Sequence, residues 1–100
     1  MIPSNFYKFL KDLKRRTLDE GLVWSSHSDT RMVEYDHENF NIRIRYYFDD
    51  DLGTPFFYIY YVDKTRGEDY VFNTSKYEAD YYEIEDIFAI AQDSGFNSPW

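Results

Sequence analysis

The sequence predicts a single α+β domain over residues 1–100, with an N-terminal helix, an antiparallel sheet of three to five strands and a C-terminal helix. Three observations favour this class. Apolar residues recur at helical spacing near both ends of the chain, and two central segments alternate between apolar and polar residues. Aromatic residues make up 22% of the chain, enough apolar material for a folded core. The helices are expected to cover one face of the sheet.

The first helix is predicted to start after Pro3, with Ser4 as its capping residue. Four apolar residues follow at helical spacing on one face: Phe6, Phe9, Leu10 and Leu13. Gly21 stands beyond the last of them and provides a stop signal.

The strands are expected between residues 22 and 73. Short candidates are 22–24 and 31–35, and residues 36–39 favour a turn. The segment 40–48 alternates strictly, and 56–62 forms a second strong strand. Residues 70–73 would close a hairpin with it. The intervening acidic runs, 49–51 and 68–69, are expected on loops at the strand ends.

The C-terminal helix is predicted at about 80–93, ending at Gly95. Asp80 followed by Glu83 fits a capping box, and Ser75 with Glu78 offers a second start. One stripe is apolar and should be buried: Tyr81, Ile84, Ile87, Phe88 and Ala91. The other side carries Tyr82, Glu85, Asp86 and Asp93. The helix dipole favours acids in a first turn, but that effect fades before Glu85.

The formal net charge is −8, and it is divided unevenly. Residues 1–21 hold five Lys/Arg against three Asp/Glu, and the remainder holds six against sixteen. This acidity argues against direct nucleic-acid binding and favours a basic protein partner. The alternative is that it only keeps an aromatic-rich chain soluble. Cysteine is absent, and no signal-peptide or membrane-spanning pattern occurs, so a cytoplasmic location is expected.

Catalytic and metal-binding signals are weak, and we expect neither an enzyme nor a cofactor. His27 lies among Ser25, Ser26, Ser28 and Asp29, but sequence neighbours rarely supply triad geometry. His37, between Asp36 and Glu38, is predicted to lie on a solvated turn and not at a metal. The Asp49–Asp51 run lacks the spacing of an EF-hand.

The uncovered sheet face offers a further alternative. Arg43, Arg45 and Tyr47 should share it with Tyr58 and Tyr60 if the two long strands pair. Aromatic rings and arginines on a sheet suit base stacking. Alternatively, they simply cover an exposed face, with the arginines paired to nearby acids. The net charge favours this second interpretation.

In size, acidity and expected element order, the chain resembles small nucleic-acid-mimic inhibitors, among them some phage anti-CRISPR and nuclease-inhibitor proteins. It equally resembles small acidic immunity proteins that neutralise basic toxins. The likeness is architectural and transfers no residue roles.

We therefore expect an inhibitor that blocks the basic, nucleic-acid-binding surface of a larger protein such as a nuclease or CRISPR effector. An immunity protein or antitoxin, and a non-inhibitory acidic interaction domain or homodimer, remain the alternatives. Acidic residues are the expected partner contacts, with Tyr82 as their aromatic anchor: Asp49, Asp50, Asp51, Glu78, Asp80, Tyr82, Glu83, Glu85 and Asp86.

Overall fold

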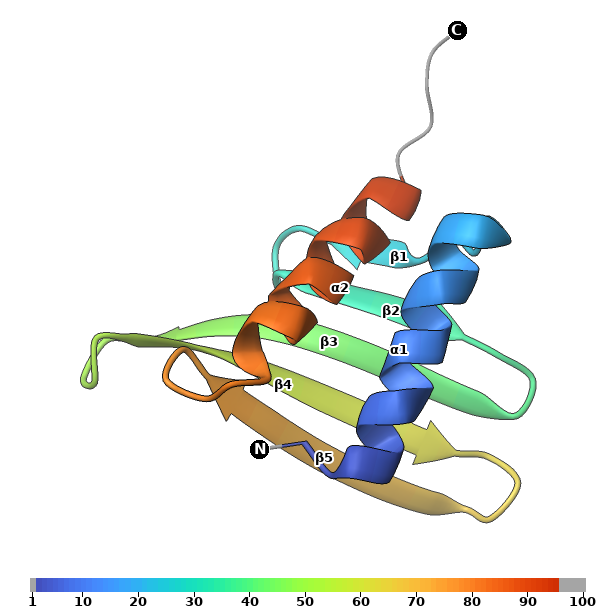
Figure 1. Ribbon diagram of the computed structural model, residues 1–100, viewed down its shortest axis with the longest axis horizontal. Coiled ribbons are helices and arrows are strands. Elements are labelled where there is room, and N and C mark those ends of the chain that lie inside the picture. Colours follow the sequence, from blue (N-terminus) through green and yellow to red (C-terminus); the bar gives the residue numbers. More distant parts are fainter. Residues whose placement is uncertain (1, 96–100) are drawn as a thin grey trace, which may run out of the picture.

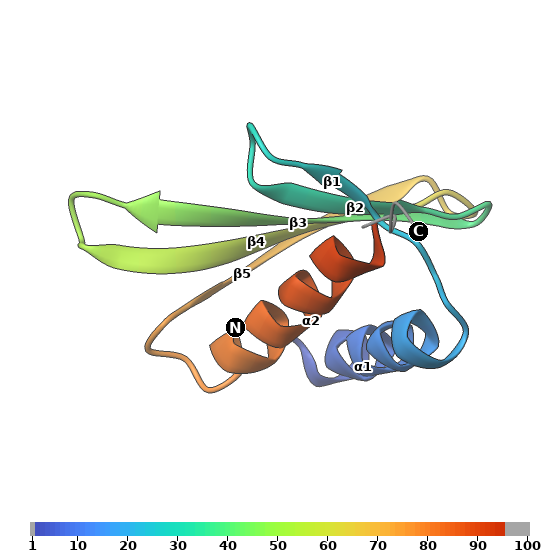
Figure 2. The ribbon, with the colours of Figure 1, turned by 90° about the horizontal axis from the view of Figure 1, so that it is seen from above.

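The computed structural model describes residues 2–95 and confirms the predicted α+β architecture. Two helices lie side by side on one face of an antiparallel five-stranded sheet (Figures 1 and 2). The strands follow one another in chain order across the sheet. In sequence order the elements are α1 (Ser4–Asp19), β1 (Ser25–His27), β2 (Met32–Asp36), β3 (Phe40–Asp49), β4 (Thr54–Asp63), β5 (Glu68–Ser75) and α2 (Tyr81–Ser94).

The long hairpin of β3 and β4 lies in the middle of the sheet. Its register pairs Ile44 with Ile59 on the helix-covered face and Arg45 with Tyr58 on the other. The strict alternation of the sequence therefore divides the strands into a buried and an open side, because successive side chains point to opposite faces. Two acidic residues predicted on a loop, Glu68 and Asp69, instead begin β5.

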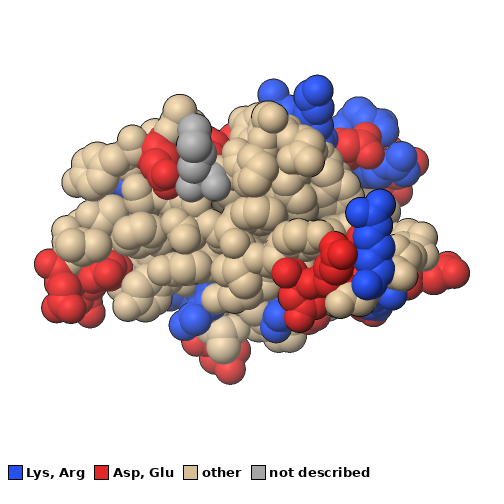
Figure 3. All heavy atoms as spheres, turned by 90° about the horizontal axis from the view of Figure 1, so that it is seen from below, with Lys and Arg blue, Asp and Glu red and all other residues tan. Residues whose placement is uncertain are grey.

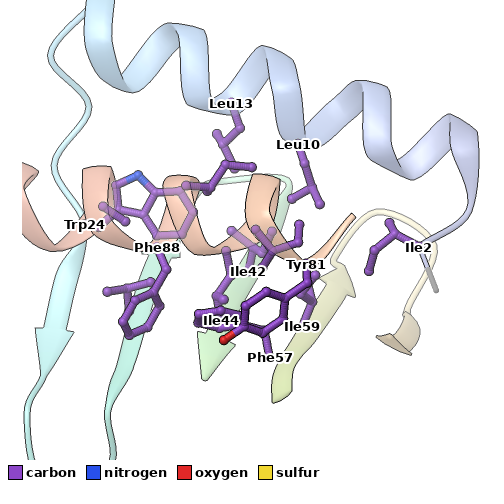
Figure 4. Close-up of a cluster of buried hydrophobic side chains, with 14 residues drawn as sticks. Ile2, Leu10, Leu13, Trp24, Ile42, Ile44, Phe57, Ile59, Tyr81 and Phe88 are labelled. Carbon is purple, nitrogen blue, oxygen red and sulfur yellow. The ribbon is translucent and has the colours of Figure 1, made fainter. Parts of the chain in front are cut away.

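The hydrophobic core lies between the helices and the sheet. Figure 4 shows Leu10 and Leu13 of α1 directed toward Ile42 of β3. The apolar stripe predicted for the C-terminal helix is buried throughout. Replacing a fully buried Leu or Ile of such a core with Ala typically lowers the free energy of unfolding by about 2–5 kcal/mol. The largest fully buried apolar side chains are Leu10, Trp24, Val33, Ile42, Ile44, Phe57, Ile59, Ile84 and Ile87.

Two predictions near the N-terminus were also wrong. Ser4 does not cap α1: it is the first helical residue, Pro3 holds the cap position, and no side chain caps the helix. Residues 22–24 are not a strand, and the short strand β1 follows them. Trp24 is drawn into the core instead, where its indole Nε1 donates to Thr17 Oγ1 at 3.0 Å.

No helix in the described part of the chain, residues 2–95, has the length and apolar character needed to cross a membrane.

Candidate partner-binding surface

The outward side of α2 places an aromatic ring beside two acids. Burial of the opposite stripe directs Tyr82, Glu85 and Asp86 to the surface, where Tyr82 is 58% exposed. Residues three and four apart on a helix are surface neighbours, so Tyr82 stands next to both acids. Of the predicted contact residues, these three are the best placed to meet a partner.

A shallow hollow adjoins this side of α2 and extends to α1. Its volume is about 560 Å³. Tyr7 supplies the α1 wall and was not among the predicted contact residues. The available signal was its spacing, because Tyr7 lies two helical turns before Lys14, a residue that also faces α2. The lining residues are Tyr7, Ala79, Tyr82, Glu83, Glu85, Asp86 and Ala89.

The basic helix neutralises part of this acidic surface. Lys14 Nζ lies 2.5 Å from Asp86 Oδ2 and 3.3 Å from Glu83 Oε1. The hydrogen bond to Asp86 raises the pKa of Lys14 above its ordinary value, so the ammonium stays charged. Two of the predicted contact residues therefore share one internal countercharge, and Glu83 is the more enclosed of the two.

Asp80 and Glu78 accept hydrogen bonds that stabilise the fold. Asp80 accepts a hydrogen bond from Thr74 Oγ1 at 2.5 Å and another from the backbone N–H of Ile2 at 2.8 Å. Asp80 occupies the cap position of α2, but its carboxylate does not cap the helix. Glu78 accepts from the Ser75 backbone N–H at 2.7 Å, and this bond lowers the pKa of Glu78. Neither carboxylate is primarily a surface group.

The acidic run 49–51 lies at the tip of the β3–β4 hairpin. Asp49 Oδ1 accepts from the backbone N–H groups of Asp51 and Leu52, at 3.0 and 3.1 Å, so it builds the turn. Asp50 and Asp51 are exposed. Figures 1 and 2 both place this tip and the first turn of α2 in the same half of the molecule, whereas α1 ends in the other half.

The acidic surface is divided into separate groups. In Figure 3, acidic atoms stand at the hairpin tip on the left and in further groups to the right, with uncharged surface and some basic atoms between them. The structure thus brings together Tyr82, Glu83, Glu85 and Asp86, and leaves Asp50 and Asp51 as a second, detached pair.

The two histidines serve local structure. His37 Nδ1 accepts from the Asn39 backbone N–H at 3.0 Å, and its ring stacks on Phe40 at a centroid distance of 4.7 Å. His27 Nε2 lies 3.4 Å from Glu34 Oε1. Within residues 2–95, no group of three or more His, Asp or Glu side chains is arranged to hold a metal ion.

No family model matches this sequence, and no curated protein or solved structure is significantly similar to it.

Proposed function

We propose that the protein is a stoichiometric inhibitor. It binds the basic, nucleic-acid-binding surface of a larger protein and blocks that surface by occupying it, without catalysis. The observation that carries this proposal is the pairing of exposed Tyr82 with Glu85 and Asp86, beside a hollow bounded by α1 and α2. Carboxylates on such a surface occupy the positions that phosphates take on a partner's arginines.

The physical chemistry of this surface suits an arginine-rich partner. A guanidinium binds a carboxylate through two parallel hydrogen bonds, and it also stacks on a tyrosine ring. Tyr82 supplies rigid contact area close to both acids, which is typical of an interface anchor. The negative charge of the chain would speed the encounter with a basic surface.

The hairpin tip is proposed as a secondary contact. Asp50 and Asp51 are exposed and lie in the same half of the molecule as the start of α2. Because the two groups are separate, a partner would have to present two basic patches to reach both. This arrangement favours a large, extended nucleic-acid-binding surface, such as that of a nuclease or a phage-defence effector.

The test is a pull-down with the tagged protein from a bacterial lysate, washed at low and then high salt, followed by competition with the captured protein's own nucleic acid. The variant Glu85→Lys/Asp86→Lys should lose the partner. A matched variant, Asp19→Lys/Glu20→Lys, makes the same charge change at the exposed end of α1 and should keep it.

A single nucleic-acid-binding protein that survives high salt and is displaced by nucleic acid supports the proposal. Full retention of that protein by Glu85→Lys/Asp86→Lys would refute the proposed site. A mixture of basic proteins lost at high salt would refute the function, because it would indicate bare charge attraction.

A further inference from the structure

The face of the sheet opposite the helices carries an array of rings and arginines. Figure 2 shows both helices on one side of the sheet, with no helix on the other. Six side chains of β3 and β4 form what we call the open-face cluster: Arg43, Arg45, Tyr47, Phe56, Tyr58 and Tyr60. All six are half-buried or exposed, so a ligand can reach them.

Three rings of the cluster follow β4 as a row. The centroids of Phe56 and Tyr58 are 6.2 Å apart with an interplanar angle of 27°. Those of Tyr58 and Tyr60 are 6.5 Å apart at 21°. Tyr47 meets Tyr58 edge-on at 6.0 Å. The row therefore presents ring surface on alternate residues of one strand, as expected where planar groups of a ligand stack.

The two arginines lie over rings and not beside carboxylates. The guanidinium carbon of Arg43 is 5.3 Å from the Tyr60 centroid, and that of Arg45 is 5.9 Å from the Tyr47 centroid. Across residues 2–95, no carboxylate lies within ion-pair distance of either guanidinium. The Nε of Arg43 is enclosed and has no hydrogen-bond partner among the described residues.

The nearest candidate acid is engaged elsewhere. Glu34 stands directly opposite Arg43 in the β2–β3 register. Its carboxylate instead accepts from Asn41 Nδ2 at 2.9 Å and faces His27. The sequence left open whether the arginines pair with nearby acids or serve a stacking platform, and these contacts favour the platform.

The acids of this face stand around the two rows that contain Arg45 and Tyr47. Asp36 and Asp69 lie in the row that crosses the sheet through Asn41 and Val62, and Lys64 pairs with Asp36 at 2.7 Å. The row through Met32, Arg45, Tyr58 and Asn73 contains no acid, nor does the paired row Tyr47, Phe56 and Ser75. Glu34 stands in the row of Arg43 and Tyr60. Asp29 and Asp50 line a hollow with Arg45 and Tyr47, so acids adjoin the cluster on several sides.

We propose that the open-face cluster binds single-stranded nucleic acid, with bases on the rings of β4 and phosphates on Arg43 and Arg45. A single strand supplies both planar groups and anions at close spacing, which matches the two kinds of side chain present. The net charge of −8 opposes long-range attraction, but at about 0.1 M salt that repulsion is screened beyond about 10 Å. This site is independent of the proposed inhibitory surface on α2.

The test is fluorescence anisotropy with a fluorescein-labelled oligothymidylate of about 12 nucleotides, at about 0.1 M salt. Arg43→Gln/Arg45→Gln should weaken binding at least tenfold, as should Tyr58→Leu/Tyr60→Leu. Tyr58→Phe/Tyr60→Phe keeps the rings and should retain binding. Lys8→Gln/Lys11→Gln removes the same charge from exposed positions on α1 and should have no effect. Circular dichroism and thermal melting confirm that each variant folds.

The salt dependence gives a second readout. Two phosphate contacts on a single strand predict a slope of about −1.4 for log K against log salt, because each contributes about −0.7. A duplex of the same sequence should bind at least tenfold more weakly, since its bases are not free to stack.

Absence of binding to the oligonucleotide at about 0.1 M salt would overturn the proposal. Equal binding by wild type and Arg43→Gln/Arg45→Gln would also overturn it. If those arginines instead prove necessary for retaining a protein partner, with no oligonucleotide bound, the face is a protein contact and the proposal is wrong. None of these outcomes depends on Glu85 or Asp86. The proposal for the open-face cluster can therefore be wrong while the proposed inhibitory surface on α2 is right, and the reverse.

Discussion

Lys14 on α1 and Asp86 on α2 are joined by an ion pair of 2.5 Å, measured from Nζ to Oδ2. The basic N-terminal segment therefore contacts the acidic C-terminal one within the fold. The pair links the two helices at the surface and removes part of the charge that a partner would meet. Its two consequences, for stability and for binding, point in opposite directions and can be measured on one variant.

Replacing Lys14 with Met keeps the length of the side chain and removes its charge. A partly exposed ion pair contributes at most about 1 kcal/mol, so the free energy of unfolding in urea should fall by no more than that. The loss should shrink at high salt, because surface pairs are screened. Partner binding should strengthen, since Glu83 and Asp86 lose their countercharge. Lys8→Met, at an exposed position on α1, is the control. A loss that salt does not change would contradict this account.

Replacing Thr17 with Val should destabilise the protein by about 1–3 kcal/mol. The hydroxyl accepts from the Trp24 indole at 3.0 Å and donates to the Leu13 carbonyl at 2.8 Å, and both side chains are buried. Valine is nearly the same shape, so the cost arises from the indole N–H left without an acceptor. Thr17→Ser keeps the hydroxyl and should recover most of the loss. Urea denaturation measures both, and equal stability of Thr17→Val and wild type would show that the bond contributes nothing.

Protonation of Glu78 at acid pH should lower the stability of the protein. The Ser75 backbone N–H holds the pKa of Glu78 below its ordinary value of 4.5. A carboxyl whose pKa is lower in the folded state stabilises the protein above its unfolded pKa, and that contribution is lost as the pH falls through the folded value. Glu78→Gln should therefore lower Tm at neutral pH, and the difference from wild type should narrow toward about pH 3.

The control for this titration is Glu38→Gln, the same chemical change on an exposed residue of the 37–39 turn. The Tm of Glu38→Gln should change with pH as the Tm of the wild type does. If the difference in Tm between Glu78→Gln and wild type stays constant from neutral to acid pH, titration of Glu78 is not its source.

The long elements could be predicted because their patterns are repeated over many residues. The alternation of β3 and the apolar stripe of α2 each involve five or more consistent positions, and both faces were assigned correctly. The short candidates 31–35 and 70–73 do lie in strands, β2 and β5, but 22–24 failed because one tertiary contact decides it. Trp24 lies in an apolar run that favours a strand, but burial against Thr17 places it outside any element.

The candidate surface was predictable only as a list of acids. Helical spacing correctly placed Tyr82, Glu85 and Asp86 on the exposed side of α2. No sequence rule showed that Asp80 would bond to Thr74, because that contact depends on how α2 is positioned against the end of β5. Charge alone therefore overestimates the surface that a partner can use.

Gly95 ends α2 as the sequence predicted, and its backbone conformation is ordinary. Its φ is −82°, a value that any residue adopts, so no left-handed conformation requires a glycine here. A Cβ at this position would lie 2.8 Å from the Trp24 carbonyl oxygen. Gly95→Ala should therefore force the helix end away from Trp24 and cost about 1–3 kcal/mol in urea denaturation. Gln92→Ala, on an exposed side chain of the same turn, should change stability by less than about 0.5 kcal/mol. Wild-type stability in Gly95→Ala would mean that the helix end yields freely and that its approach to Trp24 does not constrain the fold.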